Sequence, residues 1–295
     1  MIAPATTLRI RDRVIGFPRR PLVMAIVNVN DDSFSNDGTL NPKEALAQAE
    51  AALFAGADIV DFGAESARTN RQAITEEEEV ERLRPVLQGW SILLQKTGPK
   101  PFDEEQLWPP LLSVNTWRPG VAEPVLELGV DLLNDIGALP DDRNARLCAD
   151  HGASLLIMHS VGEPKIPHRG RRYDDVISAM ERFFEEKLTQ TGAAGLSAEH
   201  VILDPGIDFA KDRDDNLRVY RELECFHRFG RPLLLPVSRK TVIGDVLGIE
   251  NPADRDAGTL ACTTAGLLRG AQIFRVHDVA STAQAVKVLW GFFAP

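Results

Sequence analysis

The sequence Val-Ile-Leu-Asp-Pro-Gly-Ile-Asp-Phe, residues 201–209, holds the pattern that decides the fold. Three apolar residues lead into Asp204, and a proline and a glycine then turn the chain out of an extended conformation. A short apolar run that ends in turn residues is typical of a buried parallel strand. The carboxyl ends of such strands open onto the ligand crevice, so the pattern predicts Asp204 at the floor of a pocket. The alternative is a carboxylate that only caps the following turn.

The same pattern recurs on both sides of this stretch. Apolar runs predict eight strands, at 22–29, 57–62, 111–114, 130–133, 154–158, 201–203, 233–237 and 272–276. Helical patterns lie between and after them, at 42–55, 76–96, 119–128, 142–151, 173–192, 214–227, 253–269 and 279–291. Strand–helix units repeated eight times predict an α/β protein with a single (β/α)8 TIM barrel. A doubly wound sheet is the alternative, but no Gly-x-Gly-x-x-Gly turn follows the first strand.

The whole chain, residues 1–295, is therefore expected to form one barrel domain. Residues 8–17 alternate and turn back near Asp12, which predicts a short hairpin within an amino-terminal segment, 1–20. Residues 97–110 contain four prolines and predict a surface insertion, because the strand–helix alternation resumes unchanged beyond them.

Composition limits the classes of partner. A net charge of −10 argues against nucleic acid as a partner, since phosphate neutralisation needs a basic surface. Three cysteines without metal-ligand spacing indicate reduced thiols. No signal peptide is evident, and no apolar run reaches membrane-spanning length. We therefore expect a cytoplasmic protein with no membrane contact.

Polar side chains follow every predicted strand. They are Asn28, Glu65, Arg68, Asn115, Asn134, His159, Asp204, Ser238, Lys240, Arg275 and His277. Any one of them has a structural explanation, such as a capping turn or a buried core histidine. Because the active site of a barrel is built from these strand ends, their joint presence predicts a binding site.

The set divides by chemistry. Asp204, Asn134 and Asn115 offer acceptors and paired donors for the edge of a flat polar heterocycle such as an amino-pyrimidinone, whose carbonyl Lys240 would meet. A cationic group suits a phosphorylated substrate, and it comprises Arg68, Arg275, His277 and Lys240. Asn28 beside Asp32 resembles an oxygen-ligand site for Mg²⁺ that is shared with substrate phosphates.

Seven short blocks together resemble the dihydropteroate synthase family of pterin-binding TIM-barrel enzymes. They are Met-Ala-Ile-Val-Asn-Val (24–29), Asp-Ser-Phe-Ser (32–35), Gly-Ala-Asp-Ile-Val-Asp (56–61) with Glu65, Ser66 and Arg68, Leu-Asn-Asp-Ile (133–136), Leu-Asp-Pro-Gly-Ile (203–207), Ser-Arg-Lys (238–240) and Arg-Val-His-Asp-Val (275–279). The blocks appear in the family's order from residue 24 to about 290.

The resemblance implies a transferase reaction in folate biosynthesis, in which 6-hydroxymethyl-7,8-dihydropterin diphosphate and p-aminobenzoate condense and pyrophosphate leaves. By that likeness the pterin would be held by Asp204, Asn134, Asn115, Met158 and Lys240. The diphosphate would be held by Asn28, with Mg²⁺ as cofactor, and by Arg275 and His277. Arg68, Phe209 and Ser238 would shape the aminobenzoate pocket. The likeness also implies a homodimer, and it makes Asn28, Arg68, Lys240, Arg275 and His277 the catalytic residues.

Several positions depart from the family's usual pattern. Asn115 stands where Asp is usual, and Ala67, Thr69 and Asn70 stand where Thr, Pro and Gly are usual. Asp208 and Pro236 stand where Gly is usual. Asn30-Asp31 replaces Thr-Pro in the loop after the first strand. Most departures fall where aminobenzoate would lie, so they predict an active enzyme with reduced sensitivity to sulfonamides, which imitate that substrate. Asp208 would also add negative charge near an anionic drug.

Two other functions remain open. A pterin-binding paralogue without synthase activity is favoured by Asn115, Ala67 and Asp208. A folate-dependent methyltransferase of related fold is the weakest alternative, because it would not need the anion-binding residues of 238–240 and 275–277.

Overall fold

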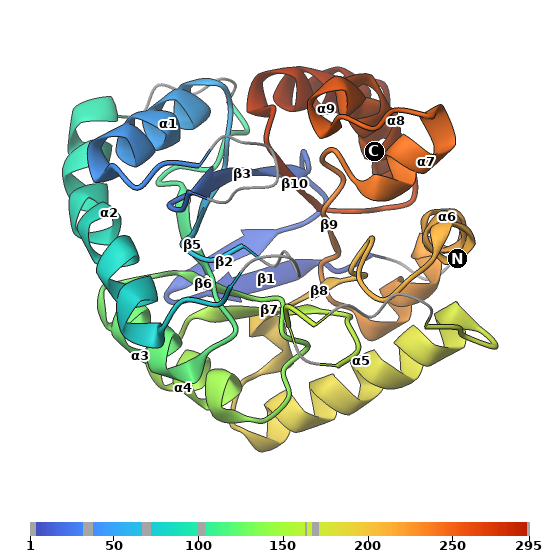
Figure 1. The fold of residues 1–295 in the computed structure, drawn as a ribbon, viewed down its shortest axis with the longest axis horizontal. Coiled ribbons are helices and arrows are strands. Elements are labelled where there is room, and N and C mark those ends of the chain that lie inside the picture. The colour runs from blue at the N-terminus through green and yellow to red at the C-terminus, as the bar shows by residue number, and fades with distance from the viewer. Residues whose placement is uncertain are drawn as a thin grey trace.

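A ring of eight parallel strands surrounded by helices forms the body of the protein in the computed structural model (Figure 1). The structure describes residues 4–31, 38–66, 72–98, 104–162, 164–166 and 171–293. The ring strands are β3 (Leu22–Asn28), β4 (Ile59–Gly63), β5 (Leu111–Asn115), β6 (Leu132–Asp135), β7 (Ser154–Met158), β8 (Val201–Asp204), β9 (Leu234–Leu235) and β10 (Ile273–Val276). The helices are α1 (Pro42–Phe54), α2 (Glu76–Thr97), α3 (Pro119–Glu127), α4 (Arg143–His151), α5 (Val176–Ala193), α6 (Arg213–Arg221), α7 (Thr241–Leu247), α8 (Asp256–Leu268) and α9 (Val279–Phe293).

The strands follow the order β8-β7-β6-β5-β4-β3-β10-β9, and every neighbouring pair is parallel. The gap between β8 and β9 is narrowed by a bridge between Leu203 and Leu233 and by a 3.0 Å bond from the Leu203 N–H to the Pro232 carbonyl. The nearly closed ring confirms the predicted TIM barrel and excludes an open doubly wound sheet.

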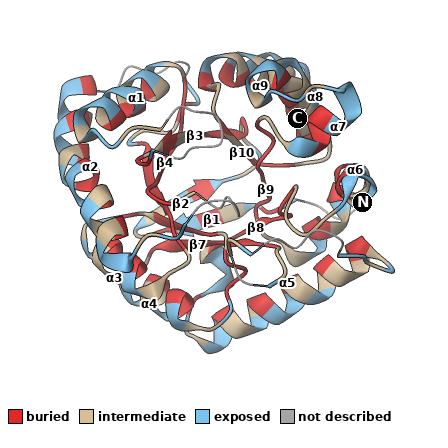
Figure 2. Cartoon of the chain, viewed as in Figure 1, coloured by how far each residue is buried: buried red, intermediate tan, exposed pale blue. Residues whose placement is uncertain are grey.

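Two apolar cores hold the barrel together. The larger core lies between the strands and the helices, where Phe62 packs edge-on against Trp90 of α2 with ring centroids 6.2 Å apart. The smaller core fills the barrel interior and includes Met24, Ile59 and Ile202. Figure 2 shows buried residues along the strands and on the inner faces of the helices, with exposed residues outside. Strands that are buried on both faces read as continuous apolar runs, which is why the sequence predicted their positions well.

The predicted hairpin is present, with β1 (Thr7–Ile10) and β2 (Arg13–Gly16) paired antiparallel. Its buried residues Leu8, Ile10 and Ile15 belong to the interior core rather than to the outer one. The hairpin therefore closes one end of the barrel. The polar strand ends lie at the other end.

Helix boundaries differ from the prediction where a side chain caps the chain. The helix predicted from 173 begins at Val176, because Asp175 accepts the N–H of Ser178 as its N-cap. The helix predicted over 214–227 ends at Arg221, and a 3-10 segment, Leu223–Phe229, continues it. Helix α7 was not predicted, because its seven residues carry too little periodic pattern.

Three further features concern the predicted insertion, the cysteines and the length of the helices. In the region predicted as an insertion, Gln106 is buried and donates to the carbonyls of Leu53 and Ala57. The three cysteines are free, with Cys148 buried and the other two half-buried. Among the helices described, none is both long enough and apolar enough to cross a membrane.

Candidate functional site

A cavity of about 280 Å³ opens at the carboxyl end of the barrel strands. It is lined by Ile26, Asn28, Gly63, Glu65, Ser66, Asn115, Asn134, Ile136, Met158, Asp204, Asp208, Phe209, Pro236, Ser238, Lys240, Thr241, Arg275 and His277. Every described residue that the sequence assigned to a substrate or metal site lies in this lining. Arg68 and Asp32 lie outside the described residues. The structure thus brings the predicted residues together, while the role of each stays a prediction.

Strand register explains why these side chains meet. Asn28, Gly63, Asn115 and Asn134 are successive partners across β3, β4, β5 and β6, so they lie at one level of the barrel. Met158 pairs with Asp204 in the same way across β7 and β8. The level forms a polar floor for the cavity.

Asp204 caps its own turn and also faces the cavity. Its Oδ1 accepts the Gly206 N–H at 2.7 Å, and the residue is only 3% exposed. Burial raises the pKa of its carboxyl to about 6, while the Gly206 N–H and the nearby Lys240, Lys211 and Arg275 cations act in the opposite direction. Both interpretations of the Asp204 turn therefore hold, and the carboxylate is poised to accept donors from a ligand.

The raised pKa of Asp204 predicts how pterin affinity depends on pH. Only the ionised carboxylate accepts two N–H groups, so affinity should be constant well above pH 6 and fall about tenfold per unit below it. Folding has the opposite sign, because the folded state holds this proton more tightly, and the contribution of Asp204 to stability declines as the pH rises from about 4 to 6. Calorimetric titration of the pterin alcohol between pH 5 and 8 measures the effect.

Asp135 supplies the control for that titration. Burial also raises its pKa to about 6, and it accepts the Gly137 N–H at 2.7 Å, but it does not line the cavity. The Asp135→Asn variant should keep the pH dependence of the parent protein. A flat affinity from pH 5 to 8 in the parent would contradict the assignment of Asp204.

Gly206 is the position where the site depends most on glycine. Its φ is 63°, and a Cβ there would lie 2.0 Å from the His159 carbonyl oxygen. Gly206→Ala should therefore lower the free energy of unfolding by about 2–4 kcal/mol, since the collision is with backbone and cannot relax easily. Gly230 has a φ of 62° with no atom within 4 Å of the added carbon, so Gly230→Ala measures the backbone cost alone. Equal losses in urea unfolding would contradict the expected collision.

Asp61 is a buried anion that the sequence prediction missed. Its Oδ2 accepts Asn134 Nδ2 at 2.9 Å and Arg275 Nε at 2.8 Å, and its Oδ1 accepts the Ser113 hydroxyl at 2.6 Å. The residue is fully buried. Asp61 therefore orients the Asn134 amide of the polar floor and the Arg275 guanidinium at the same time. The available signal was a carboxylate inside the otherwise apolar strand Ile59–Gly63.

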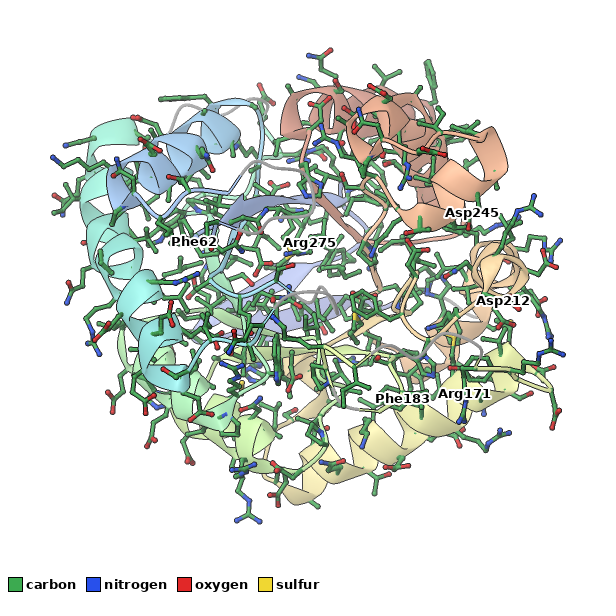
Figure 3. All side chains as sticks on the ribbon, in the orientation of Figure 1. Phe62, Arg171, Phe183, Asp212, Asp245 and Arg275 are labelled. Carbon is green, nitrogen blue, oxygen red and sulfur yellow. The ribbon has the colours of Figure 1, made fainter. Side chains whose placement is uncertain are left out.

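The cationic residues predicted to bind the diphosphate include Arg275 and His277, and Figure 3 places Arg275 within the ring of strands. Ser238 Oγ lies 2.8 Å from His277 Nδ1 and accepts the His277 backbone N–H at 3.2 Å. The hydroxyl can donate to Nδ1, which would put the ring proton of a neutral imidazole on Nε2, or it can accept a proton from Nδ1. Ser238 thus acts on the histidine, in addition to its predicted place beside aminobenzoate.

Lys240 and Phe209 form one wall of the cavity. The Lys240 ammonium donates to the Ile207 carbonyl at 3.0 Å and lies 5.1 Å from the centre of the Phe209 ring. Burial lowers the pKa of Lys240, and the Asp208 and Asp204 carboxylates oppose that shift. The wall places a cation and an aromatic face side by side.

Two strand-end residues of the predicted set have structural partners instead. His159 packs edge-on against Phe183 and lies 2.8 Å from Lys211 Nζ, and it is absent from the cavity lining. Burial lowers its pKa to about 2, with the Lys211 cation acting in the same direction. Glu65 lines the cavity, but it pairs with Arg118 at 2.6 Å and Lys165 at 2.9 Å. His159 therefore lies outside the cavity lining, while Glu65 lines the cavity and is held there by two cations.

Asn28 is the predicted metal ligand that lies in the described part of the site. Among these residues no group of three His, Cys, Asp or Glu side chains could hold an ion. The Asn28 amide oxygen lies in the same lining as Arg275 and His277. Mg²⁺ commonly takes one or two protein oxygens, substrate phosphates and water, so this donor set fits a metal that arrives with a diphosphate.

Comparison with known proteins agrees with the geometry. Residues 24–277 match the model of the family described as pterin binding enzyme. The chain is 36% identical to the dihydropteroate synthase of Escherichia coli (strain K12), over 91% of this chain and 90% of that protein. It is 38% identical to the dihydropteroate synthase of Neisseria meningitidis serogroup B, over 91% and 92% of the two chains.

Solved structures give the same result. The Yersinia pestis dihydropteroate synthase, in a sulfonamide drug complex, matches with a TM-score of 0.85 and 33% identity, over 97% of this chain and 98% of that one. The Thermus thermophilus enzyme in complex with 4-aminobenzoate matches with a TM-score of 0.82 and 33% identity, over 97% and 100%. The resemblance seen in the sequence is confirmed, and this chain belongs to the dihydropteroate synthase family of pterin-binding enzymes.

Proposed function

We propose that the protein is a dihydropteroate synthase that condenses 6-hydroxymethyl-7,8-dihydropterin diphosphate with p-aminobenzoate. The observation that carries the proposal is one cavity that joins a floor of Asp204, Asn134 and Asn115 to the cations Arg275 and Lys240. A flat heterocycle with adjacent N–H groups suits the floor, and a diphosphate suits the cations. A methyltransferase would not need the cations.

The chemistry needs no strong base. The aniline nitrogen attacks the pterin methylene while neutral, the methylene–oxygen bond breaks, and pyrophosphate takes both electrons of that bond and then the proton from the new nitrogen centre. Arg275 and the Nε2–H of His277 would stabilise the charge that develops on the leaving oxygens. The polar floor would hold the methylene in line with the amine.

Mg²⁺ is part of the same proposal. Asn28 would hold it together with the diphosphate, and the ion would neutralise charge on the leaving group. Chelation should therefore weaken binding of the pterin diphosphate and leave binding of the pterin alcohol unchanged.

A homodimer and a cytoplasmic location complete the proposal. Apolar side chains at least half exposed lie on helices that pack in sequence, α7 with α8 and α8 with α9: Val246, Leu247, Leu268, Val288, Phe292 and Phe293. Exposed apolar side chains on neighbouring helices favour association, which sedimentation measures directly. Free cysteines favour a reducing compartment.

Mass-spectrometric detection of dihydropteroate, made from the two substrates by the purified protein, tests the proposed activity. The paralogue without synthase activity predicts that the pterin diphosphate binds and stays intact. Its supporting change, Asn115, lies in the cavity lining and keeps both a donor and an acceptor. The match to synthases over nine-tenths of the chain favours the enzyme.

Reduced sulfonamide sensitivity is proposed for the same site. Of the departures behind it, Asp208 and Pro236 line the cavity, Asn30 and Asp31 do not, and 67, 69 and 70 lie outside the described residues. Discrimination of about 10–200-fold needs only ~1–3 kcal/mol, which a few altered contacts can supply. Restoring Thr at 67, Pro at 69 and Gly at 208 should lower the inhibition constant of a sulfonamide relative to the Michaelis constant for p-aminobenzoate.

A further inference from the structure

Asp208 adopts a backbone conformation that favours glycine. Its φ is 69°, in the left-handed region, where a side chain is disfavoured. The Asp208 N–H donates to Asn216 Oδ1 at 2.8 Å, and Asn216 Nδ2 lies 3.4 Å from Asp208 Oδ1. A non-glycine residue persists in such a conformation when its surroundings hold it there.

The Asp208 carboxylate holds the start of helix α7. One oxygen accepts the Thr241 N–H, and the other accepts the Val242 N–H at 3.1 Å. These are the first two N–H groups of α7, whose own N-cap, Lys240, makes no side-chain cap bond. Asp208 therefore supplies from the β8 loop the cap that the helix lacks, and its negative charge suits that helix end.

The two segments that this contact joins both carry residues of the cavity wall. Phe209 follows Asp208 directly, and Lys240 precedes Thr241. The Lys240 ammonium lies 5.1 Å from the centre of the Phe209 ring and donates to the Ile207 carbonyl, so the same pair of segments is also joined on the cavity side. The two contacts therefore join the loop that carries Phe209 to the segment that carries Lys240 at two points, and loss of the Asp208 cap removes one of them.

We propose that Asp208 is a positioning residue that clasps the β8 loop to α7 and fixes Phe209 against Lys240. It thereby narrows the aminobenzoate pocket against larger sulfonamides. The inference rests on the proposed function only for the identity of the second substrate. It gives Asp208 a second role beside its expected charge near the drug, because the carboxylate accepts backbone N–H groups of α7.

Asp208→Gly tests the clasp without adding backbone strain, since glycine tolerates the left-handed conformation. Ala210→Gly is the matched control, because Ala210 lies in the same loop with a φ of 50° and has no carboxylate. Asp208→Asn is the conservative variant, whose amide oxygen accepts one N–H while its NH₂ group cannot accept the other.

In Asp208→Gly the Michaelis constant for p-aminobenzoate should rise about tenfold, with that for the pterin diphosphate changed less than twofold. The ratio of the sulfonamide inhibition constant to the aminobenzoate Michaelis constant should fall about tenfold. Asp208→Asn should lie between Asp208→Gly and the parent protein, and Ala210→Gly should match the parent. If Asp208→Gly and Ala210→Gly change these constants equally, the clasp has no role in selectivity and the proposal fails.

Amide hydrogen exchange at Thr241 and Val242 separates this proposal from the proposed function. Loss of the carboxylate should speed exchange at both amides in Asp208→Gly and not in Ala210→Gly. A protein that forms no dihydropteroate but shows this difference keeps the clasp and loses the activity. An active protein in which neither amide exchanges faster keeps the activity and overturns the clasp.

Discussion

Replacing Asp204 by asparagine is expected to remove most of the affinity for the pterin. The buried carboxylate faces the cavity, and an amide in its place would present a donor, or one acceptor fewer, to the N–H groups of the ligand. Loss of such a buried charged hydrogen bond costs about 2–4 kcal/mol, or ~30–800-fold in Kd. Calorimetry with the pterin alcohol measures it without any contribution from the diphosphate.

Asp135→Asn is the matched control for this experiment as well. It makes the same change in a buried carboxylate that accepts the same kind of turn bond, from the Gly137 N–H, and lies outside the cavity lining. Its pterin affinity should stay within about twofold of the parent value. An Asp204→Asn variant with unchanged affinity would show that Asp204 only caps its turn.

The second large effect concerns the residues predicted to bind the diphosphate. His277→Ala should weaken binding of the pterin diphosphate by about 1.5–3 kcal/mol, or ~10–150-fold, because a hydrogen bond to a charged group is lost. The same variant should bind the pterin alcohol as the parent does. The geometry behind this expectation is the place of His277 in the cavity lining beside Arg275, with Ser238 Oγ 2.8 Å from its Nδ1.

Arg275 needs a different design. Its Nε donates to the fully buried Asp61 at 2.8 Å, so Arg275→Ala alone would leave a buried anion without its cation. The double variant Asp61→Asn/Arg275→Ala removes both charges, and Asp61→Asn alone is its reference. If the diphosphate and the alcohol lose affinity equally in the double variant and in His277→Ala, these residues support the fold and not the phosphates.

The barrel was predictable because parallel strands buried on both faces leave a strong local signal. The run Ser154–Met158 was predicted to the residue, and Pro42 at the first turn of α1 marked a helix start. The position of the site then follows from the fold, since residues at the carboxyl ends of the strands meet once the ring closes. The strand pattern alone was therefore enough to predict that Asn115, Asn134 and Asp204 lie in the floor of the cavity.

The features that could not be predicted from the sequence depend on contacts between residues that are far apart along the chain. Lys211 donates to the carbonyls of Gly206 and Phe209 and contacts His159, and its pKa is lowered to about 7 by burial. Nothing in a single lysine two residues after Phe209 indicates such burial. The cap that Asp208 gives to α7 spans more than thirty residues of sequence, so the sequence alone indicates only an added charge.

The most direct test of the account is the stoichiometry of pyrophosphate release. Pterin diphosphate and p-aminobenzoate are mixed with the protein, and pyrophosphate and dihydropteroate are counted together as the reaction runs to completion. A dihydropteroate synthase should release one pyrophosphate for each dihydropteroate formed, with no product when p-aminobenzoate is omitted. Pterin diphosphate that binds but stays intact in the presence of p-aminobenzoate would contradict it.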